Sequence, residues 1–423
     1  MNQKFNPFKP NSPVYTGMFS GRSREIDGIA KALFQTKNGN PVHILLIGER
    51  GIGKTSLLSL ANNFAKNEIN WDEQKYNFLT VQINLTEKMS VSDLAILIKN
   101  NIERELSKIN PQITLIKKFW GFISKIEACG IKYNNNDNSF DDESQIIDQF
   151  IHSLVDTVKN LTQDSKLSEV GLAQKKDGLV ILVDEADRAS KFLDLGVFLK
   201  NLTETLSIEK CNNILFILAG LPNIHRILQE SHESSLRLFQ EFELPPLSKN
   251  ETDEVITRGI KEANSISDQK ITKITIDRKA LDHIYVYSEG YPHFVQQIGY
   301  SVYDVNDNDK IDVEDVKKGF FMKGGALDLI GNRGYKKLYY SDINVESQRA
   351  ILDIMADNWN DWVTRDFIKL KFNGKETTLD NGLRALKDKN IILVKEGSRG
   401  QYRLQWASFA FWIKNHKNIK NKN

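Results

Sequence analysis

Up to residue 247, apolar residues fall into short continuous runs bounded by glycine, proline or polar residues. Such runs are typical of strands that are buried on both faces of a parallel sheet. The stretches between them carry apolar residues at helical spacing, as in Ile146, Phe150, Leu154 and Val158. This alternation predicts a doubly wound α/β domain over residues 17–247. The predicted strands are residues 42–47, 78–84, 179–187 and 213–220.

After residue 247 the pattern becomes helical only. Ser248 and Glu251 form a capping-box sequence that predicts the start of a helix. Gly290 suits the end of one helix and Pro292 the first turn of the next. These signals predict a helical lid over residues 248–322. Its further helices are expected at about 278–288, 292–304 and 312–320.

The rest of the chain divides by composition and periodicity. Residues 345–415 carry three helical segments followed by the strand-like segments IILVK and QYRLQ around GSRG, an order that predicts a winged helix-turn-helix. The remaining segments are expected to be a flexible leader (1–16), an insertion with a polar, turn-rich loop (about 108–177), a linker (323–344) and a basic tail (416–423).

Composition places the chain among ordinary globular proteins, with 40% hydrophobic and 26% charged residues in 423. No apolar run approaches the ~20 residues that a membrane helix needs. The start of the chain is polar, which argues against a signal peptide. The two cysteines, Cys129 and Cys211, have no metal-type spacing. We therefore expect a cytoplasmic protein without a membrane segment, a disulfide framework or a zinc site.

The net charge of +2 is the sum of two unlike parts. Residues 345–423 contain ten lysines and five arginines against nine acidic residues, a local charge of +6. The preceding residues therefore carry −4. The overall balance argues against a nucleic-acid partner, whereas the local excess allows one at the C-terminal module.

One segment matches the phosphate-binding pattern G-x-x-x-x-G-K-[ST] in full and lies between a predicted strand and a predicted helix. Glycines there let backbone N–H groups close around phosphate oxygens, and the helix N-terminus adds partial positive charge. Lys54 is expected to reach the β- and γ-phosphates of ATP, and Thr55 to bind Mg²⁺. The predicted loop consists of Gly48, Glu49, Arg50, Gly51, Ile52, Gly53, Lys54, Thr55 and Ser56.

Two acidic residues, Asp184 and Glu185, end the most apolar predicted strand. Asp184 there suits a second Mg²⁺ ligand, and Glu185 suits a base that polarises the attacking water. A pair of surface acids is the alternative, and the accompanying phosphate loop makes it the weaker one.

These motifs, together with residues 19–26 (FSGRSREI), occur in a familiar order. The chain resembles AAA+ ATPases of the origin-recognition and initiator clade, and the broader group of bacterial and archaeal AAA ATP-binding proteins, over about residues 17–415. The resemblance implies that Gly21 and Arg22 border the adenine pocket. It also implies that Arg237 acts as an arginine finger toward a neighbouring subunit of a homo-oligomer, with Arg226 as a competitor. The alternatives are a surface arginine at position 22 and an intramolecular salt bridge at position 237.

Two departures from that pattern bear on the expected reaction rate. The segment Ala219–Pro222 stands where such proteins place a polar sensor, which leaves Asn223 as a possible substitute. The lid carries Gly290-Tyr291-Pro292-His293, which resembles the GxP box of STAND ATPases. The resemblance implies that Pro292 packs against the nucleotide and that His293 lies near the phosphates. The resemblance therefore favours a protein that hydrolyses ATP slowly and acts as a molecular switch.

The basic residues of the predicted winged helix are the candidates for contacts with double-stranded DNA. The alternative is a winged helix that only packs against protein, and the nearby aromatic residues Trp406, Phe409, Phe411 and Trp412 are expected in its core. Two functions follow: a DNA-associated ATPase, or a STAND-like signalling ATPase that regulates a partner protein with effector activity. The DNA candidates are Lys375, Arg384, Lys387, Lys389, Lys395, Arg399 and Arg403.

Overall fold

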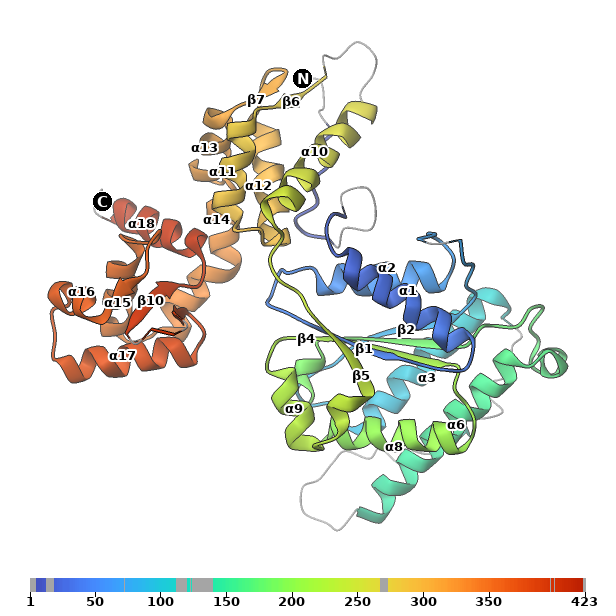
Figure 1. The fold of residues 1–423 in the computed structure, drawn as a ribbon. Coiled ribbons are helices and arrows are strands. Elements are labelled where there is room, and N and C mark those ends of the chain that lie inside the picture. Colours follow the sequence, from blue (N-terminus) through green and yellow to red (C-terminus); the bar gives the residue numbers. More distant parts are fainter. Residues whose placement is uncertain are drawn as a thin grey trace. The chain divides into compact units, whose positions relative to one another are not determined.

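The computed structural model divides the chain into two units (Figure 1). One unit is Arg22–Pro245, and the other combines Met1–Gly21 with Pro246–Asn423. The chain therefore passes between the units twice, at Gly21–Arg22 and at Pro245–Pro246. The structure describes residues 5–12, 19–71, 73–111, 120–121, 123, 140–266, 273–395, 397–398 and 400–420.

The Arg22–Pro245 unit contains a five-stranded parallel sheet of order β2-β3-β4-β1-β5. Every residue of β1, β3 and β4 is buried, which explains why these strands appear in the sequence as unbroken apolar runs. The predicted doubly wound sheet is thus confirmed. The strands are β1 (His43–Ile47), β2 (Leu79–Asn84), β3 (Leu179–Asp184), β4 (Ile214–Gly220) and β5 (Phe239–Glu243).

Helices cover both faces of this sheet (Figure 1). On one face lie α1 (Ser23–Lys37) and α2 (Lys54–Ala65). On the other lie α3 (Val91–Ile109), α6 (Phe140–Thr162), α8 (Leu195–Ile208) and α9 (Ile224–Ser231), and a short helix, α7 (Leu167–Val170), follows α6.

The described part of the predicted insertion includes α6, whose residues Phe150 and Leu154 belong to the main core of this unit. That part of the insertion is therefore integral to the domain. Residues 124–139, which include Cys129 and most of the predicted loop, lie outside the described residues.

The lid helices of the second unit follow the predicted signals closely. The Ser248 N–H donates to Glu251 Oε2 at 2.7 Å, which confirms the capping box. Gly290 has φ 73°, and Pro292 is the first residue of the next helix. The helices are α10 (Lys249–Ile266), α11 (Arg278–Ser288), α12 (Pro292–Val305) and α13 (Val313–Phe321), and the short strands β6 (Thr275–Ile276) and β7 (Lys310–Ile311) pair in parallel.

Two expectations about irregular segments are wrong. In the leader, residues 5–12 pack on the lid: Phe8 is 3% exposed, and the Lys9 N–H donates to Gln296 Oε1 at 2.9 Å. Phe5 and Phe8, set among prolines and asparagines, leave no periodic signal. The predicted linker is helical. Its glycines obscured the helical spacing of Leu327, Ile330 and Tyr335, which are buried. It contains α14 (Ala326–Ile330) and π-helical turns at Gly331–Tyr335 and Leu338–Asp342.

The C-terminal elements fit a winged helix-turn-helix, with a three-stranded antiparallel sheet of order β8-β10-β9. Phe409 and Trp412 are buried, in agreement with their predicted core role, and they share one apolar core with the lid. The elements are α15 (Glu346–Ala356), β8 (Val363–Thr364), α16 (Arg365–Lys371), α17 (Glu376–Asp388), β9 (Ile392–Val394), β10 (Gln401–Leu404) and α18 (Ala407–Lys420).

Candidate nucleotide-binding site

The predicted phosphate loop connects the end of β1 to the start of α2. Gly51 and Gly53 have φ values of 79° and 100°, a region that a side chain strains and glycine adopts freely. A Cβ atom at Gly48 would lie 2.8 Å from Ile52 Cγ2. The Gly48 N–H donates to the Gly220 carbonyl at 3.2 Å, which ties the loop to the end of β4. The glycine positions are therefore required by the backbone path of the loop.

Lys54 is the first residue of α2 and turns back onto the loop. Its Nζ donates to the carbonyls of Gly48 at 2.6 Å and Glu49 at 3.0 Å. Burial lowers the pKa of Lys54, while the charges of Asp184 and Asp187 oppose that shift. A cation is thus held inside the loop with neutral backbone oxygens as its hydrogen-bond partners.

Thr55 and Asp184 come together from opposite sides of the site. The Thr55 hydroxyl donates to Asp184 Oδ2 at 2.7 Å, and the Glu185 N–H donates to Asp184 Oδ1 at 2.9 Å. Asp184 is 7% exposed. A hydroxyl beside a buried carboxylate is an oxygen set that suits Mg²⁺ when water and phosphate complete the coordination. Among the described residues, no group of three or more His, Cys, Asp or Glu side chains could hold a metal ion.

Glu185 is placed beside Asp184, as the sequence predicted, and it has a further partner. Its φ is 54°, and its Oε2 lies 3.1 Å from the Arg188 guanidinium. Sequence reasoning missed Arg188, although its position three residues after Glu185 was visible. A base at Glu185 would therefore share its carboxylate with this half-exposed ion pair.

Asp187 is a second residue that sequence reasoning missed. Its Oδ1 accepts a hydrogen bond from the Leu221 N–H at 3.0 Å, so the end of β3 is joined to the turn after β4. A Cβ atom at Gly220 would lie 3.2 Å from the Asp187 nitrogen. Asn223, the proposed sensor, lies in this turn and is exposed; its side chain makes no hydrogen bond in the described part of the chain.

Arg22 is buried, so the alternative of a surface arginine is wrong. Its Nη2 donates to the Ile52 carbonyl of the phosphate loop at 3.2 Å and to the Pro245 carbonyl at 2.5 Å. Arg22 and Pro245 are the first and last residues of their unit. One guanidinium therefore links both crossings of the chain to the phosphate loop. Gly21, with φ 71°, lies in the other unit.

Of the two arginine-finger candidates, Arg237 is the unpaired one. It is exposed in the turn Ser235–Leu238, and no carboxylate of the described residues forms an ion pair with it. Arg226 lies 3.8 Å from Glu230. The intramolecular salt bridge considered for Arg237 is thus not found within the described ranges.

Pro292 and His293 belong to the other unit, at the start of α12. A Cβ atom at Gly290 would lie 2.0 Å from the Leu247 carbonyl oxygen, so this turn requires glycine. Burial and the neighbouring Arg333 lower the pKa of His293, while a hydrogen bond with the Pro10 carbonyl opposes that shift.

The basic residues of the winged helix fall into two groups. For one group, the part of the chain that the structure describes offers no ion-pair partner; these residues are Lys375, Arg384, Lys387 and Lys395, all exposed. In the other group, Lys389 donates to the Asp342 carbonyl at 2.6 Å, and Arg403 lies over the Trp362 ring at 5.3 Å. Arg399 lies outside the described residues.

Another arginine of this module, Arg365, was not among the predicted site residues. It binds both oxygens of Asp380, at 2.7 and 3.0 Å, and lies 3.3 Å from Glu376. These contacts raise its pKa and lower those of Asp380 and Glu376. Arg365 therefore offsets acidic charge on α17, the helix that carries Arg384 and Lys387.

Comparison with known proteins agrees with this geometry. The family model described as an AAA domain matches residues 38–228. Residues 38–228 are thus similar to an AAA domain, and we call the Arg22–Pro245 unit that contains them the AAA domain. The whole chain also superposes on the ORC2 protein of Aeropyrum pernix, solved as ADPNP and ADP complexes, with a TM-score of 0.57, 13% identity and coverage of 100% of this chain and 99% of that one. At that identity the likeness concerns the fold alone.

A curated relative is an uncharacterized HTH-type transcriptional regulator from Methanocaldococcus jannaschii, 25% identical over 270 residues. The match covers 62% of this chain and 58% of the relative, so the chain spans less than two thirds of that protein.

Within the described residues, no helix is both long and apolar enough to cross a membrane. The predicted resemblance to an AAA domain is thus confirmed for residues 38–228, and the fold is similar to that of the Aeropyrum pernix ORC2 protein.

Proposed function

We propose that the AAA domain binds ATP with Mg²⁺ and slowly hydrolyses the nucleotide to ADP and phosphate. The observation that carries this proposal is the meeting of Lys54, Thr55 and Asp184 at the phosphate loop. Lys54 and the loop N–H groups would hold the β- and γ-phosphates, and Thr55 with Asp184 would hold Mg²⁺. When bound, Mg²⁺ withdraws negative charge from the phosphate oxygens.

The residues available for hydrolysis support a slow rate. Glu185 would accept a proton from the attacking water, and its carboxylate is shared with a half-exposed ion pair to Arg188. The exposed, unpaired Arg237 is available to reach the γ-phosphate of a neighbouring subunit, which makes a homo-oligomer part of the proposal. A protein of this kind acts as a switch whose nucleotide state persists.

The proposed output of the switch is binding to double-stranded DNA by the winged helix. Support comes from the exposed cations Arg384 and Lys387 on α17, neither of which forms an ion pair within 4 Å among the described residues. Arg365 assists by neutralising Asp380 and Glu376 on the same helix. Because these contacts would be to phosphates, affinity should fall steeply with salt.

Coupling between the two activities is proposed to run through Arg22. Its guanidinium bonds the phosphate-loop residue Ile52 and also Pro245, where the chain leaves the AAA domain. A nucleotide that repositions the loop would change this hydrogen bonding at both chain crossings. The relative placement of the units would then depend on the nucleotide.

A titration of a duplex DNA at several salt concentrations tests the DNA part of the proposal. Replacing both Arg384 and Lys387 by Gln should weaken DNA binding about tenfold. The slope of the logarithm of the binding constant against the logarithm of the salt concentration should become shallower by about two. Lys318→Gln is the matched control, because Lys318 is an exposed lysine on α13 and has no partner among the described residues. Equal affinity in the double variant and the control would contradict the assignment.

A second candidate is a STAND-like signalling ATPase that regulates a partner effector protein. The observation favouring it is that the winged helix shares one core with the lid, where the Ala407 N–H at the start of α18 donates to Glu289. Glu289 is partly buried, and this burial raises its pKa, while the hydrogen bond from Ala407 opposes the shift. If the wild type shows no salt-dependent DNA binding, this candidate takes precedence.

A further inference from the structure

The AAA domain has a pocket of about 590 Å³ at the N-terminal ends of the sheet strands, whereas the phosphate loop lies at their C-terminal ends. It is lined by residues that precede β1, β3 and β4 and by the end of α6. The phosphate loop and Asp184 follow the other ends of β1 and β3. The pocket is therefore separate from the proposed ATP site, and none of the roles assigned above uses it.

Lysine dominates the lining of this pocket. Lys37, Lys159, Lys175, Lys176 and Lys210 face it, against the two carboxylates of Asp177 and Glu209. Each carboxylate is already paired, because Lys37 lies 3.3 Å from Asp177 and Lys159 lies 2.9 Å from Glu209. The remaining three lysines therefore give the pocket a net positive charge.

The fold itself accounts for Lys37 and Lys159. Both lie in the last turns of their helices, α1 and α6, where a cation offsets the partial negative charge of the helix end. Lys175 forms a pair with Asp164 at 2.9 Å, but both side chains are more than half exposed, so water screens that pair. The positions of Lys37 and Lys159 at helix ends, and the ion pair of Lys175, thus give each of these lysines a structural reason that involves no ligand.

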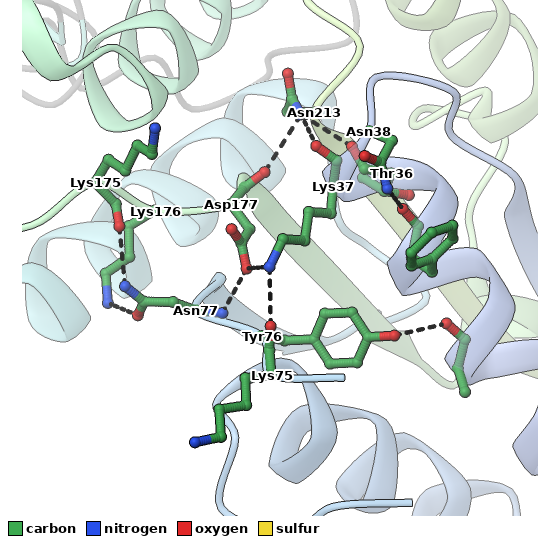
Figure 2. Close-up of polar contacts among 12 residues, drawn as sticks. Thr36, Lys37, Asn38, Lys75, Tyr76, Asn77, Lys175, Lys176, Asp177 and Asn213 are labelled. Carbon is green, nitrogen blue, oxygen red and sulfur yellow. Dashed lines mark hydrogen bonds and ion pairs between the residues drawn. The ribbon is translucent and has the colours of Figure 1, made fainter. Parts of the chain in front are cut away.

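Lys176 lacks such an explanation. It lies in the segment before β3 and is partly buried, and its Nζ donates to the neutral Asn77 Oδ1 at 2.7 Å (Figure 2). Within the described residues no carboxylate lies at ion-pair distance from it. Burial lowers the pKa of Lys176, and the Asp177 charge opposes that shift. A partly desolvated ammonium group that has no carboxylate in direct contact favours an anion.

Lys210 adds a second cation without a partner. It is exposed, and its side chain has no hydrogen-bond or ion-pair partner in the ranges that the structure describes. Its φ of 53° places it in the left-handed region directly after the end of α8, where glycine is the favoured residue. This position allows a substitution that removes the charge while relieving the backbone.

Hydrogen bonds hold the pocket walls in place. Asp177 Oδ2 accepts from the Asn77 N–H at 2.7 Å, and the Asn213 amide donates to the carbonyls of Thr36 at 2.9 Å, Lys37 at 3.1 Å and Asp177 at 3.3 Å (Figure 2). These bonds tie the end of α1 to the segments before β2, β3 and β4. The cations are thus carried on a fixed frame, which reduces the entropic cost of binding.

We infer that this pocket binds a small anion carrying several phosphate groups, at a site separate from the ATP site. Lysine ammonium groups suit phosphate as point charges. Among the described residues, no aromatic side chain lines the pocket as a stacking platform for a base, so recognition rests on the phosphates. The volume is within the range of small-molecule sites.

Tripolyphosphate titrated calorimetrically into the full chain is the test, with Lys54→Ala as background so that the phosphate loop does not compete. Saturable binding is expected, and adding Lys176→Met or Lys210→Gly should weaken it by about tenfold each. Lys210→Arg should retain it. Lys31→Gln, which removes an exposed and unpaired lysine of α1 outside the pocket, is the control and should leave affinity unchanged.

Thermal unfolding separates loss of binding from loss of fold. Lys210→Gly should unfold at the same or a higher temperature because glycine suits that backbone. Absence of saturable binding, or equal affinity in all variants, would overturn the inference. A duplex DNA titrated in parallel distinguishes the phosphate source: if both pocket variants weaken DNA binding but leave tripolyphosphate binding unchanged, the small-anion site is refuted and the pocket belongs to a DNA surface.

Discussion

The nucleotide site of the AAA domain and the basic surface of the winged helix are built in different ways. The nucleotide site is formed mainly by backbone groups and by residues adjacent in sequence. Gly51 and Gly53 adopt left-handed φ values, and Lys54 binds carbonyls of its own loop. In the second, the available charge depends on side-chain pairing across elements, as in the contacts of Arg365 with Asp380. A short sequence motif therefore predicts the first far better than the second.

The largest expected effect is at Lys54. Lys54→Ala should weaken binding of ATP with Mg²⁺ at least about 100-fold, because charged hydrogen bonds to the phosphates are lost. Calorimetric titration measures this, with Lys31→Gln as the control. Unchanged affinity in Lys54→Ala would refute the phosphate-loop assignment and remove the contrast between the two regions.

Glu185→Gln should retain ATP binding and reduce turnover about 100-fold, the usual contribution of a general base. Steady-state phosphate release measures turnover. Arg188→Gln sharpens the result, since it frees the Glu185 carboxylate from its ion pair and should leave turnover equal or higher. Full turnover in Glu185→Gln would exclude Glu185 as the base.

A smaller effect distinguishes the two kinds of arginine in the winged helix. Arg403→Gln should lower the free energy of unfolding by about 1 kcal/mol through loss of its contact with the Trp362 ring. Arg384→Gln, at an exposed and unpaired position, should leave stability unchanged and weaken DNA binding severalfold. Denaturant unfolding and DNA titration of both variants check this, and the reverse outcome would show that Arg403 is the DNA contact.

The sequence predicted those parts of the fold whose signal is local. The apolar runs of β1, β3 and β4, the Ser248–Glu251 capping box and the phosphate loop all depend on neighbouring residues. Contacts between distant residues escaped prediction: Phe8 in the lid core, Arg22 bonded to Pro245, and Asp187 bonded to Leu221. Partners so far apart in sequence leave no periodic pattern.

We propose that the nucleotide held by the AAA domain controls the DNA affinity of the winged helix. The most direct measurement is duplex DNA binding by Glu185→Gln, which should hold ATP without turnover, at one salt concentration with and without ATP and Mg²⁺. Binding with ATP should be about tenfold tighter than without it, and Lys54→Ala should show no such change. Equal DNA affinity of Glu185→Gln in both conditions, with ATP shown to be bound, would contradict the claim.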